Sequence, residues 1–344
     1  MFSCAIGLGE PMKFVRLIAL VAALALLAAA CGGDTATAPI ELDEPGAADD
    51  AAEAARAEEI EAEQEEAMED EAVEEEAMED EEAVASDMRI VSLSPTATEM
   101  LFAVGSGELL VQADTNSNYP AEAAALATIE TFPLNVEAVA GFEPTLVLSS
   151  APVEGLDALG IENMVLPAAV TFDDIYTQIE QIGATTGQVG NAAEVVANMQ
   201  ADVEEILSSV PEREVPLTYY HELDPTLFSV TSATFIGQVY SMLGLENAAD
   251  AADPDGEAFG FPQLSEEYLV NADPDIIFLA DTRCCEQNAE TVSARPGWDQ
   301  LSAVQNGNIV ELDDDTASRW SPRLVEFMRT VVDAVAELET VGAN

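Results

Sequence analysis

The stretch IVSLSPTATEMLFAVG (residues 90–105) combines a short apolar run with a helix start that follows it directly. Residues 89–93 predict a buried strand. Ser94 and Pro95 are typical of a helix start, because serine caps the free N–H groups and proline suits the first helical position. The helix is expected to reach Val104 and to end at Gly105. A strand that leads straight into a helix indicates an α/β sheet.

The same alternation continues along the chain. Further strands are expected at 109–113, 145–148, 163–166, 217–220, 275–279 and 308–312, and helices at 136–140, 156–159, 234–243, 266–271, 298–304 and 321–341. Between the two groups, apolar residues recur at helical spacing from 195 to 207, with Asn191 as the expected N-cap, Glu194 as its capping-box partner and Pro211 at the end. We expect an α/β fold of two Rossmann-like lobes, each a parallel sheet flanked by helices, joined by one long α-helix.

Two segments repeat one pattern at an offset of 130 residues. Residues 137–148 and 267–278 both predict a helix, a proline and an apolar strand, and a Gly-x-Asp-x-Leu sequence follows each, at 155–159 and 297–301. The repeat favours two related lobes. In each lobe, the loops after the carboxyl ends of the strands are expected to face a ligand-binding crevice.

The first thirty residues are typical of a secretory signal. Lys13 and Arg16 precede a uniformly apolar run, and small residues lead into Cys31. The run is too short for a stable membrane span. It resembles a bacterial lipoprotein signal, in which Cys31 becomes the lipid-modified first residue. An ordinary cleaved signal is the alternative, and Met12 rather than Met1 is the expected start.

An acidic segment follows the signal. Residues 34–87 hold 24 acidic side chains against one basic side chain, Arg56, and have few residues that could form a core. Such composition predicts a disordered tether, with a partner-binding tail as the alternative. The expected domains are the signal peptide (1–30), the lipidated cysteine and tether (31–87), the first lobe (88–188), the connecting helix (189–211) and the second lobe (212–344).

Charge and composition exclude several classes of function. The chain has 67 acidic and 10 basic residues, a net charge of −57, which argues against nucleic acid or anionic lipid as partner. His221 is its only histidine, so a histidine-built metal site is excluded, and no bound cofactor or metal is expected. No nucleophile elbow or P-loop is present, and an isolated histidine beside Glu222 is more often structural than catalytic. No enzyme activity is expected.

Several motifs, in this order, resemble the helical-backbone substrate-binding proteins of bacterial ABC importers for ferric siderophores, haem and cobalamin. The resemblance covers residues 89–338. It rests on 90–105, Asn118-Tyr119-Pro120, Glu143-Pro144-Thr145-Leu146-Val147-Leu148, Phe261-Pro262-Gln263-Leu264-Ser265-Glu266-Glu267, Asp273-Pro274-Asp275-Ile276-Ile277-Phe278 and Arg295-Pro296-Gly297-Trp298. It implies two lobes that close modestly on a metal chelate, and an ABC permease with its ATPase as partners.

The resemblance places three aromatic residues on ligand-facing loops: Tyr119, Phe228 and Phe261. Flat ligands such as corrins and porphyrins bury much apolar area against aromatic faces, although each ring could equally be core packing. Phe261 stands where a cobalamin-binding member of the family has tryptophan, which weakens a corrinoid assignment.

Basic residues follow the strands of the second lobe. Arg283 comes after the strand that ends near residue 280, and Arg319 and Trp320 come after the strand that ends near residue 312. Arginine suits carboxylate or catecholate oxygens, so these three residues are candidate ligand contacts. Salt bridges to the acidic run at 313–315 are the alternative, and Arg323 is expected to be structural.

Cys284 and Cys285 are adjacent in a loop of the expected crevice. Outside the cytoplasm they could close a vicinal disulfide, remain free thiols, or supply a thiolate ligand to haem iron. In each case the pair could shape the choice of ligand.

The family resemblance also implies two docking residues, Glu154 in the first lobe and Glu267 in the second, which would meet arginine sockets of the permease. Surface carboxylates without a role are the alternative.

We expect a monomer, anchored by lipid alone to the extracytoplasmic face of the cell membrane. A ferric siderophore is the first choice of ligand, a corrinoid the second and haem the third, and a sensor lipoprotein is the remaining alternative to an importer component.

Overall fold

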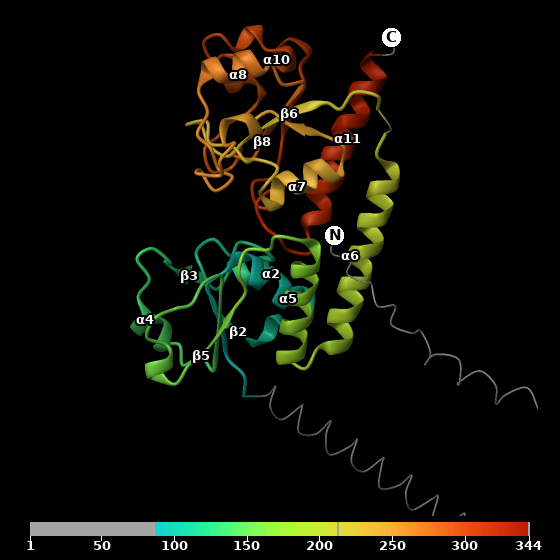
Figure 1. The fold of residues 1–344 in the computed structure, drawn as a ribbon. Coiled ribbons are helices and arrows are strands. Elements are labelled where there is room, and N and C mark those ends of the chain that lie inside the picture. Colours follow the sequence, from blue (N-terminus) through green and yellow to red (C-terminus); the bar gives the residue numbers. More distant parts are fainter. Residues whose placement is uncertain (1–86, 212, 343–344) are drawn as a thin grey trace, which may run out of the picture. The chain divides into compact units, whose positions relative to one another are not determined.

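The computed structural model describes residues 87–211 and 213–342 (Figure 1). The signal segment, Cys31 and the acidic tether up to residue 86 lie outside the described residues. Among the helices that are described, none combines the length and the apolar character needed to span a bilayer.

The first lobe is built on a parallel sheet with the strand order β3-β2-β1-β4-β5. Its strands are β1 (Ile90–Ser92), β2 (Leu110–Asp114), β3 (Ala127–Ile129), β4 (Leu146–Ser149) and β5 (Glu162–Val165). Its helices are α2 (Pro95–Ala103), α3 (Ala121–Ala124), α4 (Val136–Ala140) and α5 (Phe172–Thr185), with 3₁₀ turns at Gly107–Leu109 and Asp157–Leu159.

The second lobe is built on a parallel sheet with the order β7-β6-β8-β9. Its strands are β6 (Thr218–Glu222), β7 (Glu246–Asn247), β8 (Ile276–Leu279) and β9 (Ile309–Glu311). Its helices are α7 (Phe235–Met242), α8 (Glu266–Ala272), α9 (Ala289–Ser293), α10 (Ser302–Asn306) and α11 (Leu324–Gly342), with 3₁₀ turns at Asp250–Ala252 and Trp298–Gln300. The expected fold class is confirmed.

The segment that opens the first lobe has the local structure that its sequence predicts. All residues of β1 are buried, and the Ser94 side chain accepts a hydrogen bond from the Ala97 N–H at 3.3 Å while Pro95 begins α2. Gly105 follows the helix with a φ of 86°, a conformation that favours glycine. The 130-residue repeat is confirmed too, since α4 and β4 begin at residues 136 and 146, and α8 and β8 at 266 and 276.

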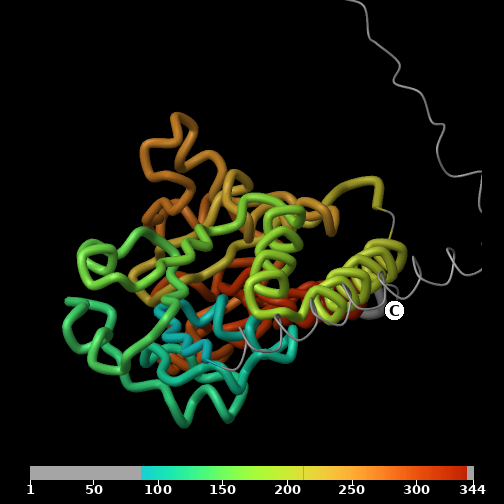
Figure 2. The backbone as a smooth tube through the Cα atoms, turned by 90° about the horizontal axis from the view of Figure 1, so that it is seen from below, coloured from blue at the N-terminus to red at the C-terminus, as the bar shows by residue number. Residues whose placement is uncertain are grey.

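The helix α6 (Val189–Ser209) lies between the two sheets in the chain and packs against α5 and α11 (Figures 1 and 2). The prediction that Asn191 caps this helix with Glu194 is wrong, because Gln188 is the N-cap residue. Asn191 lies inside the first turn, where its amide donates to the Val104 carbonyl at 3.2 Å and to Gln188 Oε1 at 2.7 Å. Asn191 therefore ties α6 to the end of α2.

Several further elements differ from expectation. The helix expected at 298–304 is a 3₁₀ turn followed by α10, and α3, α9, β3 and β7 are not among the expected elements. The last helix begins at Leu324 rather than at Ser321, whose hydroxyl instead donates to Glu99 Oε2 at 2.5 Å. The helix α5 was not expected at all. Its start is a capping box in which Thr171 Oγ1 accepts from the Asp174 N–H and Asp174 accepts from the Thr171 N–H.

Both sheets have a point where the chain reverses its order of strand addition, between β1 and β4 in the first lobe and between β6 and β8 in the second. Loops after the carboxyl ends of strands diverge at such points and leave a crevice, which is where open α/β sheets bind ligands. The main apolar cluster contains residues of both lobes, together with α6 and α11, so the two lobes share one core.

Candidate functional site

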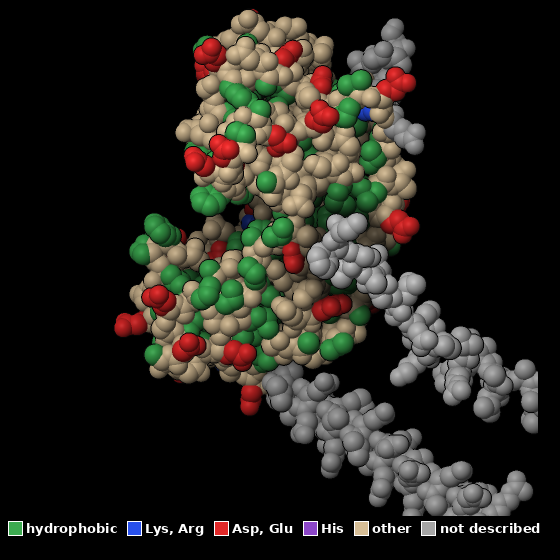
Figure 3. All heavy atoms as spheres, viewed as in Figure 1, with side chains coloured by type: hydrophobic (Ala, Val, Ile, Leu, Met, Phe, Trp, Pro, Cys, Tyr) green, Lys and Arg blue, Asp and Glu red, His purple; other side chains and the backbone are tan. Residues whose placement is uncertain are grey.

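A cavity of about 400 Å³ lies between the lobes at the reversal point of the first sheet. Three loops of the first lobe and one segment of the second line it, through Ser94, Pro95, Thr96, Thr115, Asn116, Asn118, Ser150, Asp315, Ser318, Arg319 and Trp320. Figure 3 shows acidic side chains over both lobes on this face and a hollow between them. The lining is dominated by hydroxyl and amide groups, so it can both donate and accept hydrogen bonds.

Local structure positions the hydroxyl groups of this cavity. Ser94 stands at the end of β1 as the cap of α2, and Ser150 stands at the end of β4, with 3.2 Å between their Oγ atoms. On the opposite wall, the Trp320 ring is half buried and its indole N–H is buried without an acceptor among the described residues. The ring of Trp320 thus contributes an apolar surface to this wall of the cavity.

A second cavity, of about 460 Å³, lies beside the first. Its lining consists of Glu99, Phe102, Ala103, Tyr119, Pro120, Glu122, Pro322 and Arg323. The Arg323 guanidinium stacks 3.9 Å from the centre of the Tyr119 ring, a cation–π contact that holds the ring in place. Tyr119 therefore lines this cavity, whereas Arg319 and Trp320 line the first one.

One buried carboxylate joins the lobes between these cavities. Glu99 of α2 is 3% exposed. It accepts hydrogen bonds from Arg319 Nη1 at 2.7 Å, from the Ser321 hydroxyl, and from Arg323 Nε and Nη2 at 2.9 and 2.6 Å. The acid and its partners lie more than two hundred residues apart in the chain. Sequence analysis missed Glu99, although an acidic residue inside an otherwise apolar helix was a usable signal.

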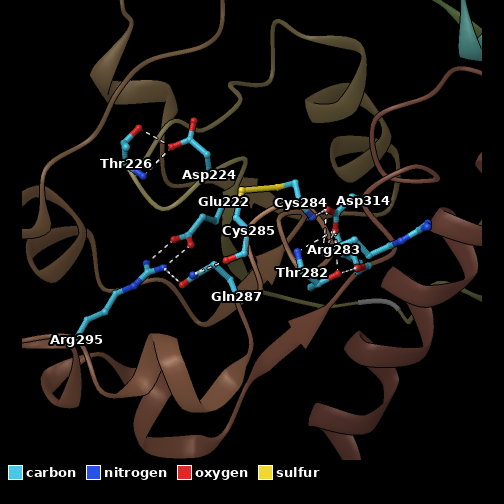
Figure 4. The surroundings of a disulfide bond; sticks show 11 residues. Glu222, Asp224, Thr226, Thr282, Arg283, Cys284, Cys285, Gln287, Arg295 and Asp314 are labelled. Carbon is cyan, nitrogen blue, oxygen red and sulfur yellow. Dashed lines mark hydrogen bonds and ion pairs between the residues drawn. A yellow bond between two sulfur atoms is a disulfide. The ribbon is translucent and has the colours of Figure 1, made fainter. Parts of the chain in front are cut away.

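The predicted contacts Arg283 and Arg319 both form salt bridges with the acidic run that follows β9. Arg319 is buried and pairs with Asp315 at 2.6 Å as well as with Glu99. Arg283 is more exposed and pairs with Asp315 at 2.7 Å. Asp314 accepts hydrogen bonds from the backbone N–H groups of Thr282, Arg283 and Cys284 and so holds the loop after β8 (Figure 4).

The structure places a disulfide between Cys284 and Cys285 at the reversal point of the second sheet (Figure 4). Beside it, Arg295 binds Glu222 through two hydrogen bonds of 2.6 Å and Gln287 through one of 2.8 Å. Glu222 is fully buried at the end of β6, and Arg295 also lies over the Trp298 ring. This cluster is a buried ion pair beneath the disulfide loop.

The remaining predicted residues lie elsewhere on the surface. Phe228 and Phe261 are 37% and 45% exposed, on two loops joined by an isolated bridge between Phe228 and Gln263. Neither lines the two cavities described above. Glu154, after β4, and Glu267, in α8, are both exposed, one on each lobe.

His221 is fully buried in the second lobe. Its Nδ1 atom lies 2.8 Å from the Tyr240 hydroxyl, as expected of a structural histidine. Burial lowers the pKa of His221 to about 3, so the ring is uncharged at neutral pH. In the described part of the chain, no three histidine, cysteine or acidic side chains come together in a way that could hold a metal ion.

Asp281 makes the stability of the second lobe depend on pH. Burial, and then the charge of Glu222, raise the pKa of Asp281 from 3.8 to about 8. The folded protein keeps a proton there that the unfolded chain releases, so the free energy of unfolding falls as pH rises from about 4 to about 8. We expect an Asp281→Asn variant, which cannot ionise, to gain stability over the natural protein progressively across that range.

Urea unfolding at pH 5 and at pH 8.5 measures this effect. The stability difference between the Asp281→Asn variant and the natural protein should be larger at pH 8.5. Asp255→Asn, at an exposed position of the same lobe, is the control substitution. An equal difference for Asp281→Asn would mean that its carboxyl titrates normally.

Comparison with known proteins gives consistent matches over the described fold. A family model described as periplasmic binding protein matches residues 90–316. An uncharacterized ABC transporter substrate-binding lipoprotein of Bacillus subtilis, YvrC, is 27% identical over 72% of this chain and 79% of its own. A cobalamin-binding protein of Halobacterium salinarum is 29% identical over 72% of this chain and 69% of its own.

Solved structures show the same architecture. A possible iron-binding, periplasmic solute-binding protein of Staphylococcus epidermidis has a TM-score of 0.61 and 26% identity, covering 72% of this chain and 98% of that one. The vitamin B12 binding protein BtuF of Vibrio cholerae has a TM-score of 0.62 at 23% identity, covering 73% and 97%, which shows the fold alone.

Proposed function

Because the chain belongs to the periplasmic binding protein family, we propose that it captures a small metal chelate between its lobes and delivers it to the permease of an ABC importer. Its relatives are substrate-binding proteins of transporters rather than enzymes. The observation that carries the proposal is the cavity of about 400 Å³ at the reversal point of the first sheet, walled by both lobes. Its hydroxyl and amide groups can donate hydrogen bonds to a ligand with many acceptors.

Two ligand classes have support. A ferric siderophore is the first candidate, and the name of the Staphylococcus epidermidis structure, a possible iron-binding protein, agrees with it. A corrinoid is the second candidate, favoured by the Halobacterium salinarum relative, which is named as a cobalamin-binding protein. In this proposal the protein is a monomer held at the extracytoplasmic face of the membrane by a lipid on Cys31.

Titration calorimetry of the full chain with a ferric siderophore, cyanocobalamin and haemin tests the proposal. We expect one class to bind at submicromolar concentration with one site. Ser150→Trp, which fills the cavity, should weaken that binding at least about tenfold, as loss of a few contacts does. Ser208→Trp on the exposed face of α6 is the matched control. If no chelate binds, the proposed function is wrong.

Docking to the permease gives a separate prediction. Glu154 and Glu267 are exposed on different lobes, and we propose that they contact basic residues of the permease. Charges at the edge of an interface steer and orient docking, so reversing both with Glu154→Lys and Glu267→Lys should abolish uptake and leave ligand affinity unchanged. Glu137→Lys with Glu180→Lys reverses two other exposed acids as a control. Undiminished uptake by the first pair would dismiss the docking role.

A further inference from the structure

We infer that the cleft selects uncharged or cationic chelates and rejects polyanionic ones, because carboxylates of the protein already neutralise its arginines. This inference rests on the proposed function and narrows its ligand. It also revises the role of Arg283 and Arg319, which the sequence suggested as direct contacts for anionic ligand groups.

Arg319 has little capacity left for a ligand. Its two terminal nitrogens donate to Glu99 Oε1 at 2.7 Å, Asn118 Oδ1 at 3.0 Å, the Asn116 carbonyl at 2.9 Å and Asp315 Oδ1 at 2.6 Å. A guanidinium has five N–H donors, so four are engaged. A ligand anion that competes for the donors held by Glu99 or Asp315 would have to displace a carboxylate from an ion pair of 2.7 or 2.6 Å, which is unfavourable at a buried site.

The other two arginines near the cavities are engaged as well. Arg323 directs Nε and Nη2 to Glu99 and covers one face of Tyr119. Arg283 directs Nη1 to Asp315 and, at 3.4 Å, to Asp313. Arg319 and Arg323 share Glu99, and Arg283 and Arg319 share Asp315, so each guanidinium forms an ion pair with at least one carboxylate.

The surroundings add negative rather than positive charge. Glu122, which is exposed, lines the second cavity, and Asp314 lies under the loop of the disulfide. In the second lobe, Arg295 is matched by Glu222 through two hydrogen bonds. Carboxylates therefore outnumber guanidinium groups around the cleft. Low-dielectric walls strengthen such a field, so a polyanion is repelled as it enters.

The polar groups that remain open to a ligand are uncharged. The exposed side chains that line the first cavity offer hydroxyl and amide groups: Thr115, Asn116, Asn118, Ser150 and Ser318. Neutral donors of this kind match the oxygens of hydroxamates and carboxamides, which surround ferric hydroxamates and corrinoids. Catecholate complexes instead need cations to offset their charge.

Three probes of different charge test the inference on the full chain: a linear ferric trihydroxamate with one positive charge, uncharged cyanocobalamin, and a ferric tris-catecholate with three negative charges. At low salt we expect the trihydroxamate or cyanocobalamin to bind at least about a hundredfold more tightly than the tris-catecholate. Raising the salt concentration should strengthen binding of the tris-catecholate, since screening weakens repulsion, and leave cyanocobalamin unaffected.

A charge variant at the cavity provides the second arm. Glu122→Lys should raise affinity for the tris-catecholate about tenfold and leave affinity for cyanocobalamin within about twofold. Glu137→Lys, on the exposed side of α4, should change neither. Tightest binding of the tris-catecholate, weakened by salt, would overturn the inference while supporting chelate capture. Failure of all three probes to bind would overturn the inference, and failure of haemin as well would overturn the proposed function.

Discussion

Replacing Glu99 by alanine should destabilise the folded protein by about 3–5 kcal/mol, as removal of one partner from a buried ion pair typically does. The expected loss of stability follows from the two arginines that lose a carboxylate partner. Arg319, which is 8% exposed, would lose one of its two carboxylate partners, and Arg323 would lose both hydrogen bonds to Glu99. The change also removes both ion pairs, to Arg319 and to Arg323, that join α2 to the segment before α11.

Chemical unfolding measures the effect, and two further variants keep the experiment informative. Glu99→Gln preserves shape but not charge, and it provides a measurement if the alanine variant does not fold. Glu205→Ala breaks a contact to Arg329 of 3.5 Å in which the acid is 70% exposed, so it should cost less than about 1 kcal/mol. If Glu99→Ala and Glu205→Ala are equally stable, the junction between the lobes does not depend on this carboxylate.

Replacing Arg295 by methionine should have an effect of the same order, about 3–5 kcal/mol, because it leaves Glu222 buried without its cation. Methionine keeps an unbranched apolar side chain but loses the guanidinium, whose Cζ lies 4.6 Å from the centre of the Trp298 ring, so the loss combines the ion pair with this cation–π contact. The destabilisation should be greater at pH 8 than at pH 5, since an unpaired buried carboxylate is relieved by taking up a proton.

Arg329→Met is the matched control for this prediction. Arg329 forms its ion pair with Asp202 on the surface, where the two side chains are 44% and 39% exposed, and exposed pairs contribute less than about 1 kcal/mol. Unfolding curves for both variants at pH 5 and pH 8 separate the buried from the exposed pair. If the free energy of unfolding of Arg295→Met falls only slightly, and equally at both pH values, Arg295 does not stabilise buried Glu222.

Both predictions concern residues whose importance could not be seen locally. The sequence shows that Arg319 follows a strand and lies close to the acidic run 313–315. It does not show that Arg319 pairs with Glu99. An ion pair across 220 residues leaves no periodicity and no motif in the sequence. The helix α5 is different, because its capping signal, Thr171 three residues before Asp174, is local and can be read from the sequence.

The sequence by itself determined the strand–helix alternation, the two related lobes, the start of α2 and the family, because apolar spacing, caps and prolines act on neighbouring residues. Tertiary structure alone decided which carboxylates meet which arginines, and hence that Arg319 is buried among partners while Trp320 lines a cavity. The physical reason is that charge pairing and burial depend on distances between segments far apart in the chain, which only packing of the two lobes sets.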